Sequence, residues 1–395
     1  MKNPPTIIFL GDGMADEPIP TLGGRTPLQA AEKPGMDRIA RQGRSGTLLT
    51  LPAGFPTSSD VANMSVLGCD LASEFCGRGP LEALARGITL GPGDVCFRLN
   101  LVTIAPDGTL ADFSGGHISQ ADADEAIALL NASLASDQVR FFPGVSYRNL
   151  LRLSGPEFNA DVKCEKPDDH PGGVVASLLP CHAGEAGRRT AETLRNLMRA
   201  AAGVLNGREA NGIWPWSGGR AGNLRTLHAR RGIRGAVISA VDVINGLGRG
   251  LGMDIIKVPG ATGYIDTCYE AKADAAIAAA HNGYDLVYAH VEAIDEVSHA
   301  GDLALKIKAI EDFDRRLVRR VMDALGDGAR YAVLPDHPVP VCKGKHTRAP
   351  VPVAVCGAGF APDDVSVFDE TAAPRGALGA LQGAQFMDIL FPQTR

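Results

Sequence analysis

Four short apolar runs in the 395-residue chain each end abruptly in glycine or in polar and acidic residues. They extend from Thr6 to Leu10, from Ala236 to Ala240, from Asp285 to Ala289 and from Tyr331 to Leu334. Continuous apolar runs of this length predict parallel strands that are buried on both faces. We therefore expect these four segments to be buried parallel strands.

A long amphipathic pattern lies between the third and fourth runs. Apolar residues recur there at three-to-four spacing, which predicts a helix with one buried face. These residues are Leu303, Ile307, Ile310, Leu317, Val321 and Leu325. Asp302 is the expected N-cap, and Gly326 is the expected stop. Strands that alternate with helices predict a doubly wound α/β sheet, whose ligands bind beyond the carboxyl ends of the strands.

The stretch from residue 94 to residue 222 interrupts this alternation. It contains turn-rich segments such as APDGTLADFSGGHIS and KPDDHPGG, and it ends in NGIWPWSGGR. We predict a smaller inserted α+β domain at 94–222. Residues 1–93 plus 223–395 would then form the core domain.

Composition narrows the partners of the chain. A net charge of -6 argues against nucleic acid, because binding to phosphate backbones depends on clustered Lys and Arg. The N-terminal segment MKNPPTIIFLGDG has an apolar run too short for a signal peptide or a membrane span, so we expect a cytoplasmic location and no membrane partner. The eight cysteines include no C-x-x-C pair, which favours reduced thiols. The sequence leaves the oligomeric state open.

The third apolar run leads into an unusual concentration of titratable side chains. The segment VYAHVEAIDEVSHAGD contains two histidines and four carboxylates within a dozen positions: His290, Glu292, Asp295, Glu296, His299 and Asp302. Asp295 and His299 are four residues apart, so a single helical turn would place both on one side. A carboxylate and an imidazole facing one point are two potential ligands for a divalent metal, although a solvated loop would account for the same pair.

Similar residues follow two other predicted strands. Asp12 follows the first run, and Asp336 and His337 follow the fourth, with His346 nearby in CKGKHT. Individually, Asp12 could cap a helix and His346 could be an exposed loop residue. Together with Asp295 and His299 they predict a binuclear site at one edge of the sheet, whose oxygen and nitrogen ligands suit Mn²⁺, Zn²⁺ or Mg²⁺.

A candidate nucleophile lies in GFPTSSDVANMSVLG. Turn-forming residues lead into a short helical pattern, which would place a serine hydroxyl and backbone N–H groups at a helix N-terminus, where phosphate binds readily. The simpler alternative is that Ser58 or Ser59 only caps the helix.

An ordered set of motifs resembles the archaeal-type, cofactor-independent phosphoglycerate mutases of the alkaline phosphatase superfamily. The set includes GDGMAD, SSDVANMSVLGCD, GRGPLEALARGI, NGIWPW, GATGYIDTCYEAKADAA, HVEAIDEVSHAGD and PDHPVP, and it extends over nearly the whole chain. The resemblance implies an α/β core like that of alkaline phosphatase and a metal-dependent mutase that acts on a small phosphorylated hydroxy acid. It also implies interconversion of 3-phosphoglycerate and 2-phosphoglycerate without 2,3-bisphosphoglycerate, through a phosphoserine.

The same resemblance assigns roles to individual residues. Ser59 occupies the position of the nucleophile. One metal ion would be bound by Asp12, Ser59, Asp336 and His337, and the other by Asp295, His299 and His346. Mn²⁺ is the first expectation for both.

The inserted domain supplies substrate groups in this family. His117 resembles its proton-handling histidine. The expected contacts with substrate phosphate or carboxylate come from Arg78, Glu82, Arg98, Asn100, Asp168, Asp169, His170, Arg220 and Lys272.

Two departures from the family pattern keep other functions open. The segment CEKPDDHPGG has Asp168, Asp169 and His170 in an altered order, and Val339 stands where Thr is common. A homoserine kinase on the same scaffold is one alternative, although the chain has no P-loop and no kinase-type glycine-rich loop. A metal-dependent phosphatase is another, and a metal-stabilised binding protein would be expected to have lost Ser59 or a metal ligand.

Overall fold

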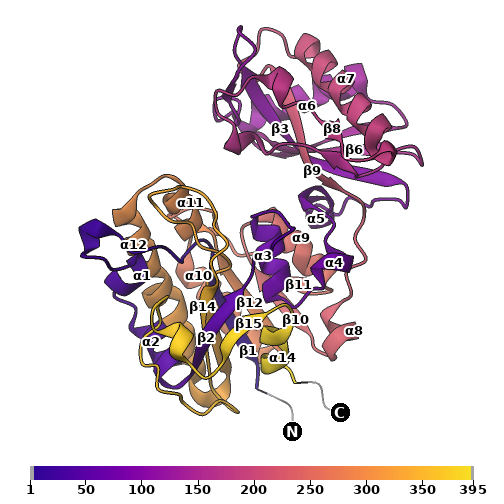
Figure 1. Cartoon of the computed structure of the whole chain (residues 1–395). Coiled ribbons are helices and arrows are strands. Elements are labelled where there is room, and N and C mark those ends of the chain that lie inside the picture. Colours follow the sequence, from indigo (N-terminus) through magenta and orange to yellow (C-terminus); the bar gives the residue numbers. More distant parts are fainter. Residues whose placement is uncertain (1–3, 393–395) are drawn as a thin grey trace. The chain divides into compact units, whose positions relative to one another are not determined.

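A computed structural model describes residues 4–392 of the chain. Its contacts divide the chain into two compact units. The core unit comprises Met1–Phe75 and Leu224–Arg395, and the inserted unit comprises Cys76–Asn223 (Figure 1). No helix in residues 4–392 is both long enough and apolar enough to cross a membrane.

The core unit contains a sheet of eight described strands in the order β11-β10-β12-β1-β13-β14-β2-β15. Their bounds are β1 (Thr6–Gly11), β2 (Gly43–Leu49), β10 (Gly235–Ile238), β11 (Asp254–Ile255), β12 (Leu286–Val291), β13 (Arg330–Leu334), β14 (Val351–Cys356) and β15 (Gly379–Gln382). The four predicted strands correspond to β1, β10, β12 and β13, within one or two residues at each end. They are consecutive neighbours and run parallel.

The α/β class predicted from the sequence is confirmed, with one addition. β14 pairs antiparallel with both β13 and β2, so the sheet is mixed. Around it lie α1 (Pro27–Ala30), α2 (Pro34–Arg41), α3 (Ser59–Val66), α4 (Leu71–Glu74), α8 (Leu227–Arg231), α9 (Asp242–Gly250), α10 (Tyr269–His281), α11 (Ala293–His299), α12 (Leu303–Asp312), α13 (Arg319–Leu325) and α14 (Gln385–Leu390). Figure 1 shows α2, α10 and α12 on one side of the central strands and α3 and α9 on the other.

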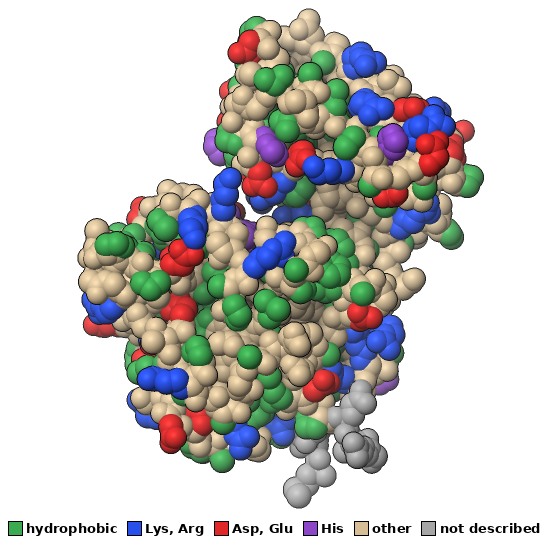
Figure 2. Space-filling view, in the orientation of Figure 1, with side chains coloured by type: hydrophobic (Ala, Val, Ile, Leu, Met, Phe, Trp, Pro, Cys, Tyr) green, Lys and Arg blue, Asp and Glu red, His purple; other side chains and the backbone are tan. Residues whose placement is uncertain are grey.

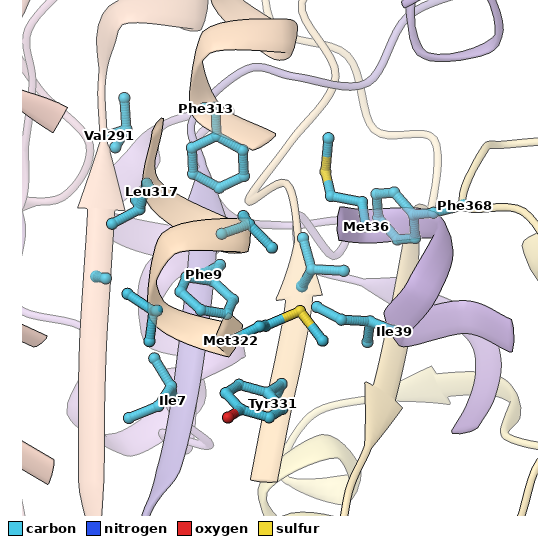
Figure 3. Packing of buried hydrophobic residues seen from close by; sticks show 14 of the residues in the cluster. Ile7, Phe9, Met36, Ile39, Val291, Phe313, Leu317, Met322, Tyr331 and Phe368 are labelled. Carbon is cyan, nitrogen blue, oxygen red and sulfur yellow. The ribbon is translucent and has the colours of Figure 1, made fainter. Parts of the chain in front are cut away.

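The main core forms because alternate strand residues face the same layer of helices. Ile7 and Phe9 of β1 belong to this cluster, and the ring of Phe9 stacks on that of Tyr331 with centroids 6.3 Å apart. Figure 3 shows Phe313 and Leu317 packed over this face. The side chains of β1 that alternate with these point to the opposite face, on which α3 lies.

The predicted helix between the third and fourth strands is present, with one irregularity. Asp302 accepts a hydrogen bond from the backbone N–H of Leu305 at 2.9 Å, as expected of an N-cap. The helix ends at Gly326, whose φ of 52° favours glycine. Between α12 and α13, Phe313–Val318 forms a π-helical turn. The wider turn shifts which residues point to the buried face. A uniform three-to-four spacing in the sequence does not reveal this shift.

The inserted unit is built on a separate antiparallel sheet. Its strands follow the order β4-β3-β6-β5, and β9 also pairs with β3. Its elements are α5 (Arg78–Ala85), β3 (Asp94–Ile104), β4 (Leu110–Asp112), α6 (Gln120–Leu134), β5 (Val139–Val145), β6 (Arg148–Ser154), β7 (Val162–Lys163), β8 (Cys181–His182), α7 (Arg188–Val204) and β9 (Gly212–Gly219). Alternate residues of β3 pack with apolar residues of α6 and α7 in a core of its own.

The first junction between the units differs from the predicted one. Residues 76–93 were expected in the core domain, but they pack with the inserted unit. The reason is a close approach of α5 to β3: a side chain at Gly79 would come within 2.3 Å of the carbonyl oxygen of Cys96. Glycine is therefore needed where the helix meets the strand.

Within the core unit, Glu74 connects the segment from which the chain enters the inserted unit with the segment at which it returns to the core unit. Its carboxylate accepts a hydrogen bond from the backbone N–H of Arg225 at 3.0 Å and forms an ion pair with Arg230. The side chain of Glu74 is 3% exposed. Residues 151 positions apart in sequence are thus fastened together at the base of the insertion.

The visible surface carries charges of both signs. In the view of Figure 2, Lys and Arg are interspersed with Asp and Glu on each unit, with no broad basic face.

Candidate metal centre and active site

The candidate ligands come from the carboxyl ends of three neighbouring parallel strands. Asp12 directly follows β1, Asp295 and His299 lie in α11 after β12, and Asp336 and His337 follow β13. Because β1 pairs in parallel with both β12 and β13, these ends share one edge of the sheet. The sequence hypothesis required this convergence.

A first group surrounds the imidazole of His337. Its Nε2 lies 3.4 Å from Oδ1 of Asp12 and 3.4 Å from Oδ2 of Asp336, and all three side chains are fully buried. Ser59 Oγ is 3.2 Å from the same nitrogen. Carboxylates, an imidazole and a hydroxyl therefore face one small volume.

A second group surrounds Asp295. The Nε2 atoms of His299 and His346 are 2.9 Å apart, and they lie 3.4 Å and 3.6 Å, respectively, from its two carboxylate oxygens. His299 Nδ1 is 2.8 Å from the carbonyl oxygen of Gly344, so this nitrogen donates, and in the neutral ring Nε2 carries the lone pair. Two nitrogens aimed at one carboxylate are a donor set that fits a divalent cation.

The two groups are adjacent. The rings of His337 and His346 stack with centroids 3.8 Å apart. Ligand atoms of Asp12, Asp295 and His337 lie within 4.8 Å of one another. At Gly13, φ is 64° and a side chain would meet Asp295 Oδ1 at 2.6 Å, so glycine lets the loop after β1 pass close to Asp295.

The electrostatics of the site also fit cations. Burial raises the pKa of Asp12 well above its ordinary value, and the charges of Asp336, Asp295 and Glu292 raise it further. Burial likewise raises the pKa of Asp336. Buried carboxylates that repel one another are stabilised by a nearby divalent cation, because the cation favours their charged forms.

The nucleophile candidate lies at the start of α3. Ser58 is the N-cap residue, but its side chain makes no capping hydrogen bond, and Ser59 is the first residue of the helix. The Ser59 hydroxyl is the one that faces His337. The helix N-terminus contributes backbone N–H groups that favour an anion there.

Two buried residues next to this centre were not singled out as site residues. His290 Nε2 is 3.1 Å from Asp12 Oδ2, and Asn63 donates from Nδ2 to Asp336 Oδ2 at 2.9 Å. Both are 0% exposed. The available sequence signal was weak: one is a histidine inside an apolar strand, and the other is an asparagine one turn after Ser59.

Four predicted substrate residues lie together in the inserted unit. Glu82 accepts hydrogen bonds from Arg78 Nε at 2.7 Å and from Arg98, and Arg98 Nε is 3.4 Å from Asn100 Oδ1. Both guanidinium groups lie over the ring of Trp216, at 5.8 Å and 5.7 Å. Two cations share one carboxylate, and the side chain of Arg78 is 20% exposed.

The other predicted residues of the inserted unit lie on its loops. His117 is exposed and has a φ of 55°, and its backbone N–H donates to Ser114 Oγ at 3.0 Å. Asp168 pairs with Lys166 at 3.1 Å. His170 Nε2 is 3.4 Å from the carboxylate of Glu165. Asp169 is the last residue of the short helix Pro167–Asp169, directly before His170 in the sequence.

Two further residues predicted to contact substrate donate hydrogen bonds to backbone carbonyls. Lys272 is 1% exposed and donates to the carbonyl oxygen of His290 at 3.0 Å. Arg220 donates to the carbonyl oxygens of Pro92, at 3.0 Å, and of Phe158. These cationic groups are used to hold backbone segments together.

Comparisons with known proteins show which family the chain resembles. The family model described as 2,3-bisphosphoglycerate-independent phosphoglycerate mutase matches residues 40–211. A protein of that name from Methanosarcina acetivorans is 44% identical, and the match covers 97% of this chain and 98% of the relative. A probable 2,3-bisphosphoglycerate-independent phosphoglycerate mutase from Geobacter sulfurreducens is also 44% identical, with the same coverage.

Two solved structures extend the similarity to three dimensions. The structure of the PH0037 protein from Pyrococcus horikoshii has a TM-score of 0.82 at 25% identity and covers 100% of this chain and 99% of its own. The cofactor-independent phosphoglycerate mutase from Thermoplasma acidophilum has a TM-score of 0.66 at 28% identity, with 98% and 99% covered. The chain therefore belongs to the archaeal-type family of 2,3-bisphosphoglycerate-independent phosphoglycerate mutases.

Proposed function

We propose that this chain interconverts 3-phosphoglycerate and 2-phosphoglycerate, with Ser59 carrying the phosphoryl group between the two half-reactions. The observation that carries the proposal is the position of the Ser59 hydroxyl. It begins α3 and lies 3.2 Å from His337 within a set of carboxylates and imidazoles. Membership of the mutase family supports the choice of reaction.

Two divalent cations would complete the site. Asp12, Ser59, Asp336 and His337 would bind one, and Asp295, His299 and His346 the other. Mn²⁺ is the first expectation, and Zn²⁺ and Mg²⁺ are alternatives that the donor types also permit. When bound, such cations act as Lewis acids that offset charge on phosphoryl oxygens.

In the first half-reaction, Ser59 Oγ forms a bond to phosphorus while the bond from phosphorus to the C3 oxygen of the substrate breaks. The serine hydroxyl loses its proton, and the departing glycerate oxygen gains one. The N-terminal N–H groups of α3 are oriented to stabilise the phosphoryl oxygens. The products are phosphoserine and glycerate.

In the second half-reaction, the C2 hydroxyl of glycerate attacks phosphoserine, and the Ser59 Oγ–phosphorus bond breaks. A base must take the C2 hydroxyl proton, and the candidates are His117 and the group Asp168, Asp169 and His170 of the inserted unit. Ser59 recovers a proton, so the cycle is balanced. Water must be kept from the phosphoserine, because hydrolysis would turn the mutase into a phosphatase.

The inserted unit is proposed to anchor the anionic substrate. Arg78 and Arg98 place two guanidinium groups around the single carboxylate of Glu82, with Asn100 beside them. The excess positive charge and the partial exposure of Arg78 suit a carboxylate or phosphate. Arg220 and Lys272 receive less support, because both already donate to backbone carbonyls.

The direct test supplies purified protein with Mn²⁺ and 3-phosphoglycerate, omits 2,3-bisphosphoglycerate, and follows 2-phosphoglycerate through coupled enolase. Rapid formation of 2-phosphoglycerate that disappears in Ser59→Ala is the expected result. A parallel reaction with ATP and homoserine tests the kinase alternative, and release of inorganic phosphate tests the phosphatase. Phosphohomoserine formation without 2-phosphoglycerate would replace the mutase proposal with a kinase on the same centre.

A further inference from the structure

Asn63 connects the helix that bears Ser59 to a carboxylate of the metal centre. It lies one turn after Ser59 in α3 and is 0% exposed. Its Nδ2 donates to the carbonyl oxygen of Ser59 at 2.8 Å and to Oδ2 of Asp336 at 2.9 Å. We propose that Asn63 is a positioning residue, which fixes the spacing between Ser59 and Asp336 so that nucleophile and cation are held in register.

The oxygen of the Asn63 amide has a partner of its own, on the other side of the side chain. Tyr288, in β12, donates its hydroxyl to Oδ1 of Asn63 at 2.5 Å. A flipped amide would place Oδ1 against the Ser59 carbonyl and the Asp336 carboxylate, bringing three acceptors together without a proton between them. The Ser59 carbonyl and the Asp336 carboxylate therefore select the orientation in which both amide protons are directed at the active centre, and Tyr288 satisfies the remaining amide oxygen.

These bonds join three separate parts of the core unit. Ser59 belongs to α3, Asp336 to the loop after β13, and Tyr288 to the central strand β12. The other carboxylate oxygen of Asp336 accepts the backbone N–H groups of Gly13, at 3.1 Å, and His337, at 2.8 Å. Asp336 is thus held on both oxygens, and Asn63 supplies the side-chain donor on the Ser59 side.

Packing alone does not account for asparagine at this position. Asparagine is a poor helix former, and burying an amide is unfavourable unless its hydrogen bonds are satisfied. A leucine would fill similar space in a helix interior and favour the helix. The full set of partners, together with the direction of both donors, indicates a role in orienting the site.

The test compares Asn63→Ala, Asn63→Asp and Tyr288→Phe with Ser65→Ala. Asn63→Asp keeps the shape and an acceptor for Tyr288 but removes the donor to Ser59 and Asp336. Tyr288→Phe keeps the ring and removes the donor to Oδ1 of Asn63. Ser65 is the matched control, because it is buried in the same helix and its hydroxyl bonds only to the backbone carbonyls of Thr50 and Val61.

The primary measurement is Mn²⁺ affinity, by titration of each folded variant with detection of free Mn²⁺. Removal of residues that orient metal ligands typically weakens metal binding about 10- to 100-fold, and we expect this for both Asn63 variants. Tyr288→Phe should shift affinity in the same direction by less, and Ser65→Ala should leave it unchanged. The melting temperature is recorded for all variants.

The second measurement is turnover, and it rests on the proposed mutase function. Misplacement of a catalytic group by about 1 Å can lower the rate roughly 100-fold, so kcat should fall far more than KM changes. If the wild-type protein binds Mn²⁺ but does not convert 3-phosphoglycerate, the mutase proposal fails while the affinity comparison still tests Asn63.

Asn63 variants with wild-type Mn²⁺ affinity and a lowered melting temperature would overturn the inference and leave Asn63 a packing residue. If neither Asn63 variant folds, Tyr288→Phe decides: weakened Mn²⁺ binding supports the role, and unchanged affinity overturns it.

Discussion

His290 Nε2 lies 3.1 Å from Oδ2 of Asp12, and both side chains are fully buried. On the other side of the ring, Nδ1 is 3.2 Å from Ser239 Oγ, which itself accepts the backbone N–H of Val241 at 3.0 Å. Burial lowers the pKa of His290 to about 3, so the ring is neutral. The Ser239 hydroxyl then donates to Nδ1, and the proton on Nε2 is donated to Asp12.

This relay predicts different outcomes for two substitutions of similar size. In His290→Gln the side-chain amide can replace the Nε2 donor to Asp12, whereas in His290→Asn the shorter side chain cannot reach it. We expect His290→Asn to weaken Mn²⁺ binding about 10- to 100-fold and His290→Gln to retain most of the affinity. Mn²⁺ titration distinguishes them, and equal affinities in the two variants would remove His290 from this role.

Metal binding should be linked to proton release. In the metal-free protein, burial and repulsion from neighbouring carboxylates raise the pKa of Asp12, and burial raises that of Asp336. A cation binds the deprotonated carboxylates, so its affinity should weaken as the pH falls. Calorimetric titration in two buffers with different ionisation enthalpies would measure the protons released.

The same two carboxyls affect stability in the opposite direction from ordinary acidic groups. Their pKa values are higher in the folded state than in the unfolded state, so without metal their contribution grows as the pH falls and is lost as it rises. Bound cations remove that loss. The difference in melting temperature between Mn²⁺-loaded and metal-free protein should consequently increase with pH, and a difference independent of pH would contradict this linkage.

The inserted unit should depend strongly on one buried carboxylate. Burial alone would raise the pKa of Glu82, but the guanidinium groups of Arg98 and then Arg78 lower it below its ordinary value. Glu82→Gln leaves buried Arg98 without its charged partner, which costs about 3–5 kcal/mol of unfolding free energy. Because the pKa is lowered, the difference from wild type should be largest at neutral pH and shrink in acid.

Fluorescence isolates this effect in the inserted unit, since both tryptophans of the chain, Trp214 and Trp216, lie in β9. The matched control is Glu125→Gln, which removes an ion pair with Arg208. The side chain of Arg208 is 32% exposed and that of Glu125 is 58% exposed. An exposed pair of this kind contributes at most about 1 kcal/mol. Similar losses in the two variants would show that burial does not distinguish the pairs.

Arg348 holds the loop that leads to Ser59. Its guanidinium donates to the carbonyl oxygens of Leu51 at 3.3 Å, Pro52 at 2.8 Å and Phe55 at 2.5 Å. Arg348→Ala should loosen this loop and lower kcat by about 10-fold, because Ser59 would be less precisely placed. Hydrogen exchange should rise at residues 51–58, and Lys345→Ala is the control from the same loop with the same change in charge. Unchanged exchange and turnover would exclude the clamp.

The sequence predicted the framework of the core unit because its central strands are buried on both faces. Continuous apolar runs such as Ile7 to Leu10 and Leu286 to Ala289 have a strong pattern, and the groups at their carboxyl ends must meet when the strands are parallel neighbours. The apolar pattern alone therefore predicts that Asp12, Asp295 and Asp336 share one edge of the sheet. The positions of Ser59 and His346 depended more on resemblance to a family.

Other features could not be predicted from local pattern. His290 and Asn63 gain their meaning from partners 278 and 273 residues away, and a buried polar side chain looks the same in sequence whether its partner is a ligand or a backbone group. The junction near residue 76 depends on the contact of Gly79 with β3, which is a close approach between distant segments. The backbone hydrogen bonds of Lys272 and Arg220 could not be predicted either, because the carbonyl partners lie 18 residues away for Lys272 and 128 and 62 residues away for Arg220.

Glu74 has a consequence for the evolution of this architecture. Glu74 lies just before the first residue of the insertion and binds Arg225 and Arg230, which lie just after its last residue. For the core unit, the 148-residue insertion is therefore equivalent to a loop whose two ends are already held together. The entropic cost of closing a loop grows only slowly with its length. Inserted segments of different size could therefore be exchanged between these two points with little loss of stability in the core unit. The inserted unit could then be replaced as a whole, while the fold of the core unit was retained.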